Sequence, residues 1–534
     1  MMGNVHESDD WGMFTADGPW VLVRDRIAWL PDAPRLRAEA LDEMRSATQP
    51  SRLPPGGRGA VVAGRLGSAL AAWQWRKRLG RFDADAAASR ADLSRRLRLA
   101  AEALGPTYIK LAQIISAGEG LFPSELVGEF RLCRDQVPSE TIDTVRRTVE
   151  EDLGQRLDDV FSSFDEVPLA AASIAQVHAA VLHSGESVVV KVQRPTVARR
   201  VRDDLRVMAW LAPRLVGRIN IASLANPPAL VELFAETIVE ELDFRIEAAN
   251  MVELAGVLRS LDLDRYVVPR PHPTLVTRRV LVMERLSGFK FDDVKGMQSA
   301  GIDTEEVIRN GMVAFMEGAL IHGVFHGDLH GGNLFVLEDG RTALLDFGII
   351  GRLSDARRLA FMRLMVSAAT NDVRGQVAAL RDLGALPADT DLDAVISDLG
   401  LDRPAIDPTT LTGEQLVAEV QRLVRALLAY GAKVPKELML YVKNLMFLDG
   451  AIATLAPDLD LLAEISHISL TFTARHGAQL GTELGIDPTG LALDLTSVKA
   501  GFGVDAEVER LTYRELQARR RLIQRRMQGR IGRR

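Results

Sequence analysis

Three polar residues near the middle of the chain have the types and spacing that phosphate chemistry requires. Asp328 stands five residues before Asn333 in the run HGDLHGGN, and Asp346 follows Asn333 by thirteen residues and opens an Asp-Phe-Gly triplet. A positioned carboxylate can accept or orient the proton of an attacking oxygen, and Mg²⁺ prefers hard ligands such as carboxylate and amide oxygens. We therefore predict that Asp328 is the catalytic carboxylate of a phosphoryl transfer and that Asn333 and Asp346 hold the metal.

Short apolar runs flank these residues and predict how they are positioned. Leu334–Val336 follows Asn333, residues 344–345 precede Asp346, and the Glu-Asp-Gly of 338–340 is a hairpin turn signal. Two strands joined by a tight turn would bring Asn333 and Asp346 to the same end of a hairpin. This order and spacing match the catalytic loop and metal-binding segment of the protein-kinase fold; an ordinary polar turn is the alternative.

Composition describes a large globular protein. The 534 residues are 47% hydrophobic, which allows two or three domains. The single cysteine, Cys133, excludes an internal disulfide and suits a reducing compartment. The first residues lack the basic-then-apolar pattern of a signal peptide. The most apolar segment, Leu438–Leu455, contains Lys443, Asn444 and Asp449, so we expect a buried or amphipathic helix and a cytoplasmic protein.

Basic residues are concentrated in two segments. Residues 510–534 contain ten Arg and one Glu, and residues 71–78 place two Trp beside three basic side chains. Such basic amphipathic segments bind anionic membrane surfaces, so we expect a peripheral protein at the inner face of a membrane. The tail residues of the expected helical stripe are Leu516, Ile523, Met527 and Ile531. The alternatives are a solvated or nucleic-acid-attracting basic segment and simple core packing of the Trp residues; no specific nucleic acid is expected.

The pattern along the chain predicts an α+β, two-lobe fold. Strands are expected at 187–192 and 277–284, and a linker near 52–59. Helices are expected at 60–104, from Thr107, and at 140–166, 198–217, 227–258, 303–324 and most of 355–480. These elements divide the chain into a variable N-terminal region at 1–94, a helical extension at 95–160, an N-lobe at 161–287, a C-lobe at 288–460 and a helical region with a basic tail at 461–534.

Two further residues complete a nucleotide site. Lys191 lies in the middle of the strand VVVKVQRP, where a Lys either meets an anion or faces water at a sheet edge. A kinase uses such a Lys on the α- and β-phosphates and braces it with a helical Glu, for which Glu247 is the candidate. The expected glycine-rich loop is replaced by the alanine-rich Ala170–Ser173, whose alternative interpretation is the start of a helix.

Several motifs in the same order resemble the UbiB/AarF (ADCK-like) family of atypical kinases. They are PLAAASIAQVH, VVVKVQRP, ELDFRIEAAN, the HGDLHGGN and LLDFG pair, and GPTYIKLAQ, in which Lys110 and Gln113 match the KxGQ motif. The resemblance covers about two-thirds of the chain, roughly residues 95–460.

The resemblance implies a kinase-like fold that binds ATP and Mg²⁺, and it implies roles for individual residues. Lys191 and Glu247 correspond to the ATP-contacting pair, and Glu241 and Asp243 to the ExD motif that the KxGQ helices contact. The residues implied to bind nucleotide are Ala170, Ala171, Ala172, Ser173, Lys191, Met283 and Glu284.

The resemblance also implies a function. In the family the KxGQ helices cover the place where a protein kinase binds peptide, which argues against phosphorylation of proteins. The family is linked to isoprenoid quinone biosynthesis, with ATP hydrolysis tied to lipids or membranes. Quinone-biosynthesis proteins and an anionic membrane are therefore the implied partners. A small-molecule phosphotransferase of the aminoglycoside or choline kinase type, and a non-catalytic nucleotide-binding scaffold, are the alternatives.

The chain departs from the family pattern at a few positions. Where the family usually has HADPHPGN, this chain has Leu329 and Gly331 in place of the prolines, so we expect a less rigid catalytic loop. Ala112 replaces the KxGQ glycine and is expected to perturb a close helix contact. If the ExD segment is fully helical, Glu241 and Asp243 lie on different faces and only one can reach Lys110.

Overall fold

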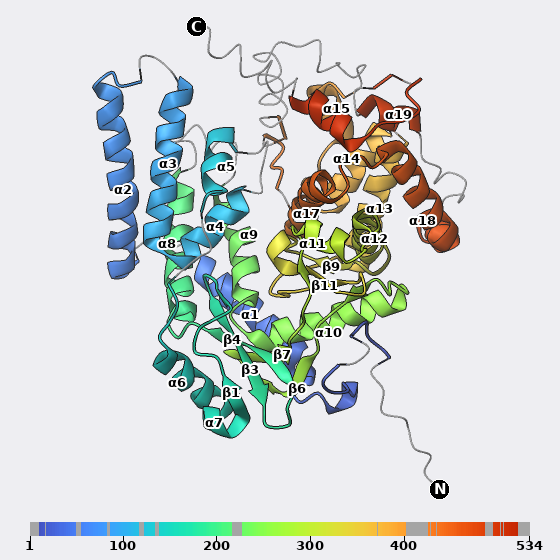
Figure 1. Cartoon of the computed structure of the whole chain (residues 1–534). Coiled ribbons are helices and arrows are strands. Elements are labelled where there is room, and N and C mark those ends of the chain that lie inside the picture. Colours follow the sequence, from blue (N-terminus) through green and yellow to red (C-terminus); the bar gives the residue numbers. More distant parts are fainter. Residues whose placement is uncertain are drawn as a thin grey trace. The chain divides into compact units, whose positions relative to one another are not determined.

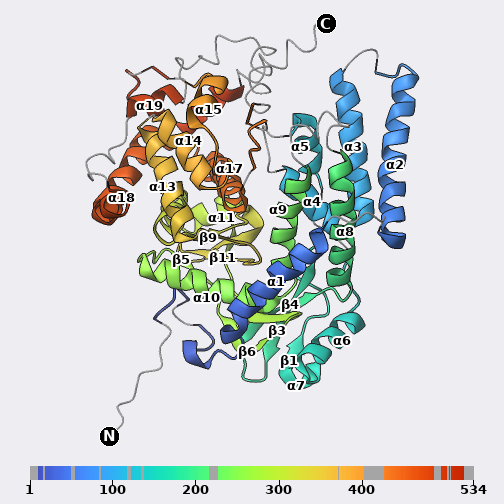
Figure 2. The same ribbon diagram turned by 180° about the vertical axis from the view of Figure 1, so that it is seen from behind.

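The computed structural model describes residues 10–15, 18–49, 55–82, 86–116, 122–133, 138–215, 227–370, 372–401, 426–427, 429–433, 435–485, 495–501, 504–505 and 507–521. Its elements are labelled in Figures 1 and 2. Two compact units are present. The first comprises Met1–Gly256, Val267–Leu286 and Leu345–Ile349, and the second comprises Val257–Tyr266, Ser287–Leu344 and Ile350–Arg534. The unit boundary at Leu286 and Ser287 falls beside the lobe boundary expected from sequence.

An antiparallel sheet forms the centre of the first unit. Its strands run in the order β1-β3-β4-β7-β6, and β2 pairs with β3. They are β1 (Phe161–Phe164), β2 (Ala170–Ala171), β3 (Ala175–Leu182), β4 (Ser187–Gln193), β6 (Pro271–Val276) and β7 (Val280–Glu284). The strands expected at 187–192 and 277–284 are thus present as β4 and β7. In β4, Val188, Val190 and Val192 are buried on one face, so the alternation of a strand places Lys191 on the other.

Helices make up the rest of the first unit. The N-terminal extension contains α1 (Ala33–Thr48), α2 (Gly56–Arg78), α3 (Ala86–Leu104), α4 (Pro106–Ser116) and α5 (Ser124–Phe130). Then come α6 (Ile142–Leu153), α7 (Leu157–Val160), α8 (Val197–Leu215), α9 (Pro227–Glu240) and α10 (Phe244–Ser260), whose last turn belongs to the second unit. Helices α2 and α3 run side by side as a long hairpin (Figures 1 and 2), while α6 packs Val145 and Val149 against the valines of β4.

Three expected boundaries in this unit were wrong. Residues 56–59 of the expected linker form the first turn of α2, because the Arg58 guanidinium donates to Asp204 at 2.6 Å and to the Leu104 carbonyl at 2.8 Å. The expected helix at 140–166 ends early, since its last residues pair with β3 as strand β1. The expected helix at 227–258 is broken between Glu240 and Phe244.

The second unit combines short strands with a helical bundle. One sheet has the order β5-β11-β10-β8, and β9 pairs with β12. The strands are β5 (Tyr266–Val267), β8 (Phe289–Lys290), β9 (Val324–His326), β10 (Leu334–Val336), β11 (Thr342–Leu344) and β12 (Ile350–Arg352). The helices are α11 (Val294–Ser299), α12 (Thr304–Glu317), a π-helical turn (Gly318–His322), α13 (Asp355–Ala369), α14 (Val373–Asp382), α15 (Leu392–Leu399), α17 (Lys436–Leu455), α18 (Leu461–Leu484) and α19 (Leu495–Gly501).

The predicted hairpin after the catalytic run is confirmed. Strands β10 and β11 are antiparallel, with Leu334 opposite Leu344 and Val336 opposite Thr342. Gly340 closes the turn with a φ of 82°, a left-handed conformation that glycine adopts without strain. The hairpin therefore begins directly after Asn333, as its apolar runs indicated.

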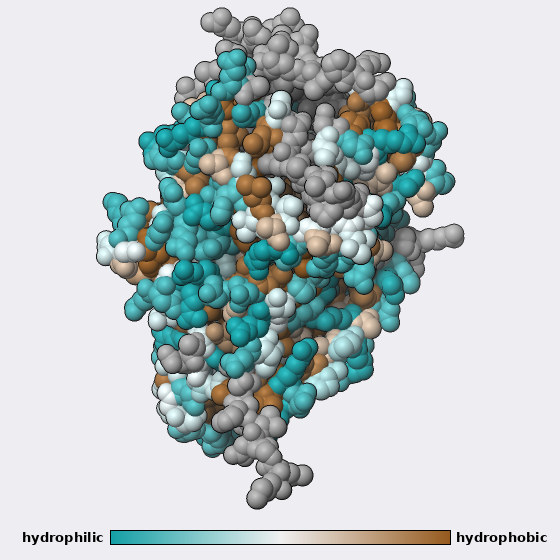
Figure 3. All heavy atoms as spheres, turned by 90° about the vertical axis from the view of Figure 1, so that its right-hand side faces the viewer, coloured by the Kyte–Doolittle hydropathy of each residue, from teal (hydrophilic) through white to brown (hydrophobic). Residues whose placement is uncertain are grey.

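Helix α17 is a core helix of the second unit. Among the described helices it alone is long and apolar enough to cross a membrane, judged by length and composition only. Its Tyr441 ring nevertheless stacks on Phe315 at 4.6 Å and meets Phe361 edge-on at 4.6 Å, and Asn444 is fully buried. This packing agrees with the buried helix expected from sequence. On the face of the molecule shown in Figure 3, hydrophobic residues form scattered patches among hydrophilic ones, as is usual for a globular surface.

The start of the basic tail packs against the protein. Tyr513 and Leu516 are buried, and the Tyr513 amide donates to the Leu459 carbonyl at 3.2 Å. The expectation that Leu516 belongs to a membrane-facing stripe was therefore wrong, because its side chain is already covered. The other stripe residues, Ile523, Met527 and Ile531, lie outside the described residues.

Two glycines allow a test of the close backbone approach that precedes strand β9. Gly323 and Gly485 each end a helix with a φ of 69°, but only at Gly323 would a Cβ crowd backbone, 2.7 Å from the Leu353 carbonyl oxygen. We expect Gly485→Ala to cost about 1 kcal/mol of unfolding free energy, and Gly323→Ala to cost about 1–3 kcal/mol more. Denaturant unfolding measures both; equal losses would contradict the close approach.

Candidate functional site

Lys191 lies between two carboxylates in the first unit. Its ammonium nitrogen donates to Glu247 Oε1 at 2.7 Å and to Asp346 Oδ1 at 3.2 Å. The Lys191 side chain is 13% exposed and that of Glu247 is 2% exposed, whereas Asp346 is 49% exposed. The ion pair predicted between Lys191 and Glu247 is therefore present, and the structure adds Asp346 as a second partner.

The break between α9 and α10 places Glu247. Because α10 starts afresh at Phe244, Glu247 lies in its first turn, where the helix dipole favours a negative charge. The Phe244 ring lies under the Lys191 ammonium, 5.5 Å from its centroid, an arrangement that attracts a cation. The first turn of α10 and the strand β4 thus meet at one buried ion pair.

The electrostatics of this group favour a charged Lys191. Burial alone lowers the pKa of Lys191, but the carboxylates of Asp346 and Glu247 outweigh burial and raise this pKa above its usual value. Burial also raises the pKa of Glu247 to about 7, against the opposing influence of the Lys191 ammonium. Ionised Glu247 therefore depends on its cation.

Asp346 has a conformation that few non-glycine residues adopt. Its φ is 55°, in the left-handed region, which is typical of residues held by their surroundings at functional sites. The surroundings are visible: the next residue, Phe347, is buried, and its carbonyl accepts a hydrogen bond from the Asn250 amide at 2.8 Å. The Gly348 amide donates back to Asp346 Oδ1 at 3.3 Å.

The KxGQ and ExD residues meet in the first unit. The Lys110 ammonium on α4 lies 3.0 Å from Glu241 Oε1, whereas Asp243 binds the Arg245 guanidinium at 2.7 Å. The segment is not fully helical, since α9 ends at Glu240 and α10 begins at Phe244, so the condition of the spacing argument is not met. Gln113 is half-buried.

Ala112 packs where α4 meets α5. Its side chain is 1% exposed and belongs to a hydrophobic cluster with Leu126 and Phe130 of α5. The methyl group therefore lies in an apolar contact between α4 and α5, and its effect on the closeness of that contact stays a prediction.

The alanine-rich segment forms the edge of the sheet. Ala170 and Ala171 are strand β2, paired with Val177 and Gln176 of β3, so the alternative of a helix start is excluded. The turn that follows is closed by the Ala172 amide, which donates to the Ala175 carbonyl at 2.8 Å. Ser173 in this turn is buried. A role in nucleotide binding stays a prediction for these residues.

Met283 and Glu284 end strand β7 and are both buried. The Glu284 carboxylate accepts hydrogen bonds from the Arg270 amide at 3.1 Å and from the Thr15 hydroxyl. Its side chain is thus occupied within the protein, and a nucleotide role for either residue stays a prediction.

The HGDLHGGN run, residues 326–333, lies in the second unit. Asp328 follows strand β9, and its amide donates to His326 Nδ1 at 3.1 Å. The Asn333 side-chain amide nitrogen donates to the Asp328 carbonyl at 2.9 Å, which orients its side-chain oxygen away from that bond. Carboxylate and amide oxygens are the donor types that Mg²⁺ takes, and each of the two predicted metal residues, Asn333 and Asp346, carries such an oxygen.

Helix α17 contributes two residues that sequence reasoning missed. The Lys443 ammonium forms an ion pair with Asp328 Oδ1. Asn444 accepts a hydrogen bond from the Leu329 amide at 3.0 Å and donates to the His326 carbonyl. The available signal was a pair of polar residues inside an apolar helix, since buried polar groups need partners.

The same contacts bear on the rigidity of the loop. A proline at position 329 has no N–H, so the bond from Leu329 to Asn444 is one that a proline could not make. At the position where the family pattern has a proline, this loop is therefore hydrogen-bonded to α17. The rigidity of the loop stays a prediction.

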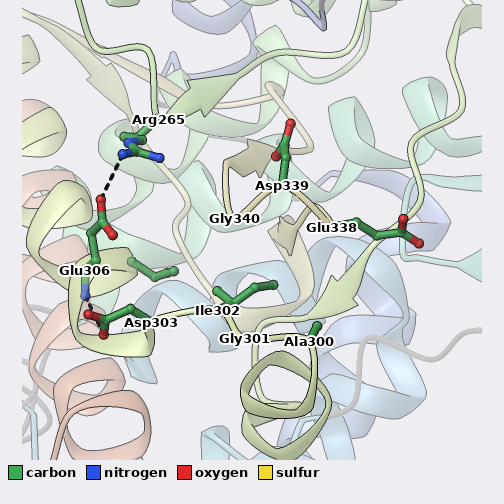
Figure 4. Close-up of a pocket in the computed structure, with 10 residues that line it drawn as sticks. Arg265, Ala300, Gly301, Ile302, Asp303, Glu306, Glu338, Asp339 and Gly340 are labelled. Atoms are coloured by element: carbon green, nitrogen blue, oxygen red, sulfur yellow. Dashed lines mark hydrogen bonds and ion pairs between the residues drawn. The ribbon is translucent and has the colours of Figure 1, made fainter.

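The second unit also has a surface hollow of about 220 Å³ (Figure 4). Two of its acidic residues have structural partners: Asp303 caps α12 by accepting from the Glu305 amide at 2.9 Å, and Glu306 pairs with Arg265 at 3.2 Å. It is lined by Arg265, Ala300, Gly301, Ile302, Asp303, Glu306, Val307, Glu338, Asp339 and Gly340. None of these is a predicted site residue, so the hollow is not a candidate for the reaction.

A preformed metal cage is not seen in the part of the chain that the structure describes, where no three His, Cys, Asp or Glu side chains gather.

Comparisons with known proteins identify the family of the chain. The model of the ABC1 atypical kinase-like domain matches residues 132–380, so the fold is kinase-like. An uncharacterized protein of Mycobacterium tuberculosis is 37% identical over 68% of this chain and 74% of its own. An uncharacterized chloroplastic aarF domain-containing protein kinase of Arabidopsis thaliana is 33% identical over 69% and 73%, and the probable protein kinase UbiB of Histophilus somni is 31% identical over 68% of each. The chain belongs to the UbiB/AarF family of atypical kinases.

A double-mutant cycle tests the buried ion pair. Lys191→Met leaves Glu247 buried without its cation, at an expected cost of about 3 kcal/mol in unfolding free energy. Adding Glu247→Gln removes the orphaned charge, so the double variant should be at least about 1 kcal/mol more stable than the sum of the single losses predicts. Denaturant unfolding measures the cycle.

The exposed pair Arg35 and Glu39 is the matched control, because both side chains are more than half exposed. The same cycle there should give no measurable coupling. Additive losses at Lys191 and Glu247 would show that their contact is not energetically coupled.

Proposed function

We propose that this protein binds Mg-ATP and hydrolyses it or transfers its γ-phosphoryl group. The observation that carries the proposal is the Lys191 ammonium held between Glu247 and Asp346. A structural ion pair needs one carboxylate for one cation. The second, half-exposed carboxylate of Asp346 in a left-handed backbone conformation instead fits a group kept ready for a ligand.

Each residue has a distinct task in this proposal. Lys191 would bind nucleotide phosphates, and Glu247 keeps its ammonium in place. Asp328 would orient the attacking hydroxyl or water and receive its proton. Asn333 and Asp346 would each supply an oxygen to Mg²⁺. The bound metal would neutralise the charge of the phosphates.

The acceptor is proposed to be water or a small isoprenoid or lipid-related molecule rather than a protein. The Lys110 and Glu241 contact supports this, because it ties the N-terminal helices to the segment that immediately precedes Glu247. A role in isoprenoid quinone or membrane lipid metabolism follows from the family resemblance. Transfer to a small alcohol without any lipid effect would instead favour the small-molecule phosphotransferase, and nucleotide binding without turnover would favour the scaffold.

Asp346→Asn tests the metal role. Loss of the carboxylate charge should weaken Mg-ATP binding at least about tenfold and abolish phosphate release, because the amide is a poorer Mg²⁺ ligand. Calorimetric titration with and without Mg²⁺, together with phosphate release, gives both values. Asp339→Asn is the matched control, since Asp339 bonds only within its turn region to Arg341 among the contacts described. Turnover that survives Asp346→Asn would contradict the proposal.

We further propose that α2 binds an anionic membrane surface. Helix α2 contains five basic residues and no acidic one, and Val61, Trp75 and Leu79 expose 50%, 65% and 56% of their surface. Trp73, in contrast, packs on α3 and donates to the Ser89 carbonyl at 3.0 Å. Packing within the protein therefore explains Trp73 but not Trp75. Trp75 and the nearby Lys77 are both exposed.

Vesicle sedimentation tests the α2 proposal. Substituting Lys77 and Arg78 by Gln should weaken binding to anionic vesicles by about 2 kcal/mol, close to 30-fold at low salt. Trp75→Ala should weaken it further through lost apolar insertion. Leu470→Ala on α18, equally exposed and apolar, is the control and should have no effect. Binding that is insensitive to salt and to these changes would contradict the proposal.

A further inference from the structure

The proposed catalytic carboxylate has its cation on a distant part of the chain. Between Asp328 and Asn333 the loop contains only Leu, His and Gly residues, so the loop itself supplies no Lys or Arg. The Lys443 ammonium, 115 residues away in sequence, contacts Asp328 Oδ1. This contact is separate from the Lys191 group, which belongs to the first unit.

Lys443 is held in a fixed position by its helix. The preceding turn of α17 carries Tyr441, whose ring packs on Phe315, Phe325 and Phe361. The next residue, Asn444, is fully buried. A cation between such anchors has little freedom, so its position is set by the core of the second unit.

Asn444 ties the same helix to the backbone of the loop on both sides of Asp328. It donates to the carbonyl of His326 and accepts from the amide of Leu329. Two consecutive residues of α17 therefore hold the backbone around Asp328 and the carboxylate of Asp328 itself.

We infer that Lys443 is a positioning residue for the reaction, which orients the Asp328 carboxylate toward the attacking group, while Asn444 fixes the loop that carries it. The inference rests on the proposed function and deepens it. Phosphoryl transfer asks the protein chiefly for positioning and charge stabilisation, and small misplacements of a reacting group cost large factors in rate. The ammonium contact at Oδ1 favours one orientation of the Asp328 carboxylate.

The alternative is that the ion pair between Lys443 and Asp328 is purely structural and only joins α17 to the loop. The Lys443 and Asp328 side chains are 23% and 16% exposed, so the pair is largely but not fully buried. Loss of a purely structural pair would lower stability and nucleotide binding together. Loss of a positioning contact would lower the rate constant while binding is retained, which separates the two.

The test compares Lys443→Met, Lys443→Arg and Asp328→Asn in the full chain, with Lys436→Met at the start of the same helix as control. ATP turnover with Mg²⁺ gives kcat, and titration with Mg-ADP gives nucleotide affinity independently of turnover. We expect Lys443→Met to lower kcat about 100-fold with affinity unchanged, Lys443→Arg to recover most of the rate, and Lys436→Met to match the wild type.

The outcomes are separable. Full turnover in Lys443→Met, alongside loss in Asp328→Asn, overturns this inference and leaves the proposed function standing. A joint loss of folding stability and Mg-ADP affinity in Lys443→Met, not recovered by Lys443→Arg, assigns the pair to structure and also overturns it. Absence of both turnover and nucleotide binding in the wild type overturns the proposed function and the inference with it.

Discussion

A buried ammonium group between two carboxylates constrains the whole first unit. Burying Lys191 is favourable only if anions compensate its lost hydration. That requirement explains how a charged side chain can stand in the middle of strand β4, since α10 begins where Glu247 can reach it. It also explains the unusual backbone of Asp346, which brings a second carboxylate to the same cation.

The second unit solves a different problem, that of holding a glycine-rich loop in one conformation. Its loop lacks the prolines usual in the family, and glycines on their own leave the backbone free. The structure restrains it through buried hydrogen bonds from α17, in which Asn444 uses the N–H that a proline at position 329 would lack. The loop is thus held by tertiary contact, which makes the packing of α17 a condition for its conformation.

Local patterns predicted the strands and the hairpin well because their signals are local. The alternating valines around Lys191 define a strand, and the glycine at position 340 defines a turn. Both effects depend only on residues a few positions away. Boundaries failed where distant contacts decided. Residues 56–59 have the composition of a linker but are helical, because Arg58 binds Asp204. The end of the 140–166 segment forms a strand because it pairs with β3.

The sequence by itself determined the family, the kinase-like fold and the identity of the groups that could perform phosphate chemistry, because these depend on residue types at fixed short spacings. It also determined that Glu247 was the natural partner of Lys191, since a buried cation demands an anion. Only the tertiary structure decided which further groups share those charges. Asp346 joins Lys191, and Lys443 joins Asp328 across 115 residues, because ion pairs between elements far apart in sequence form only when packing has brought those elements together.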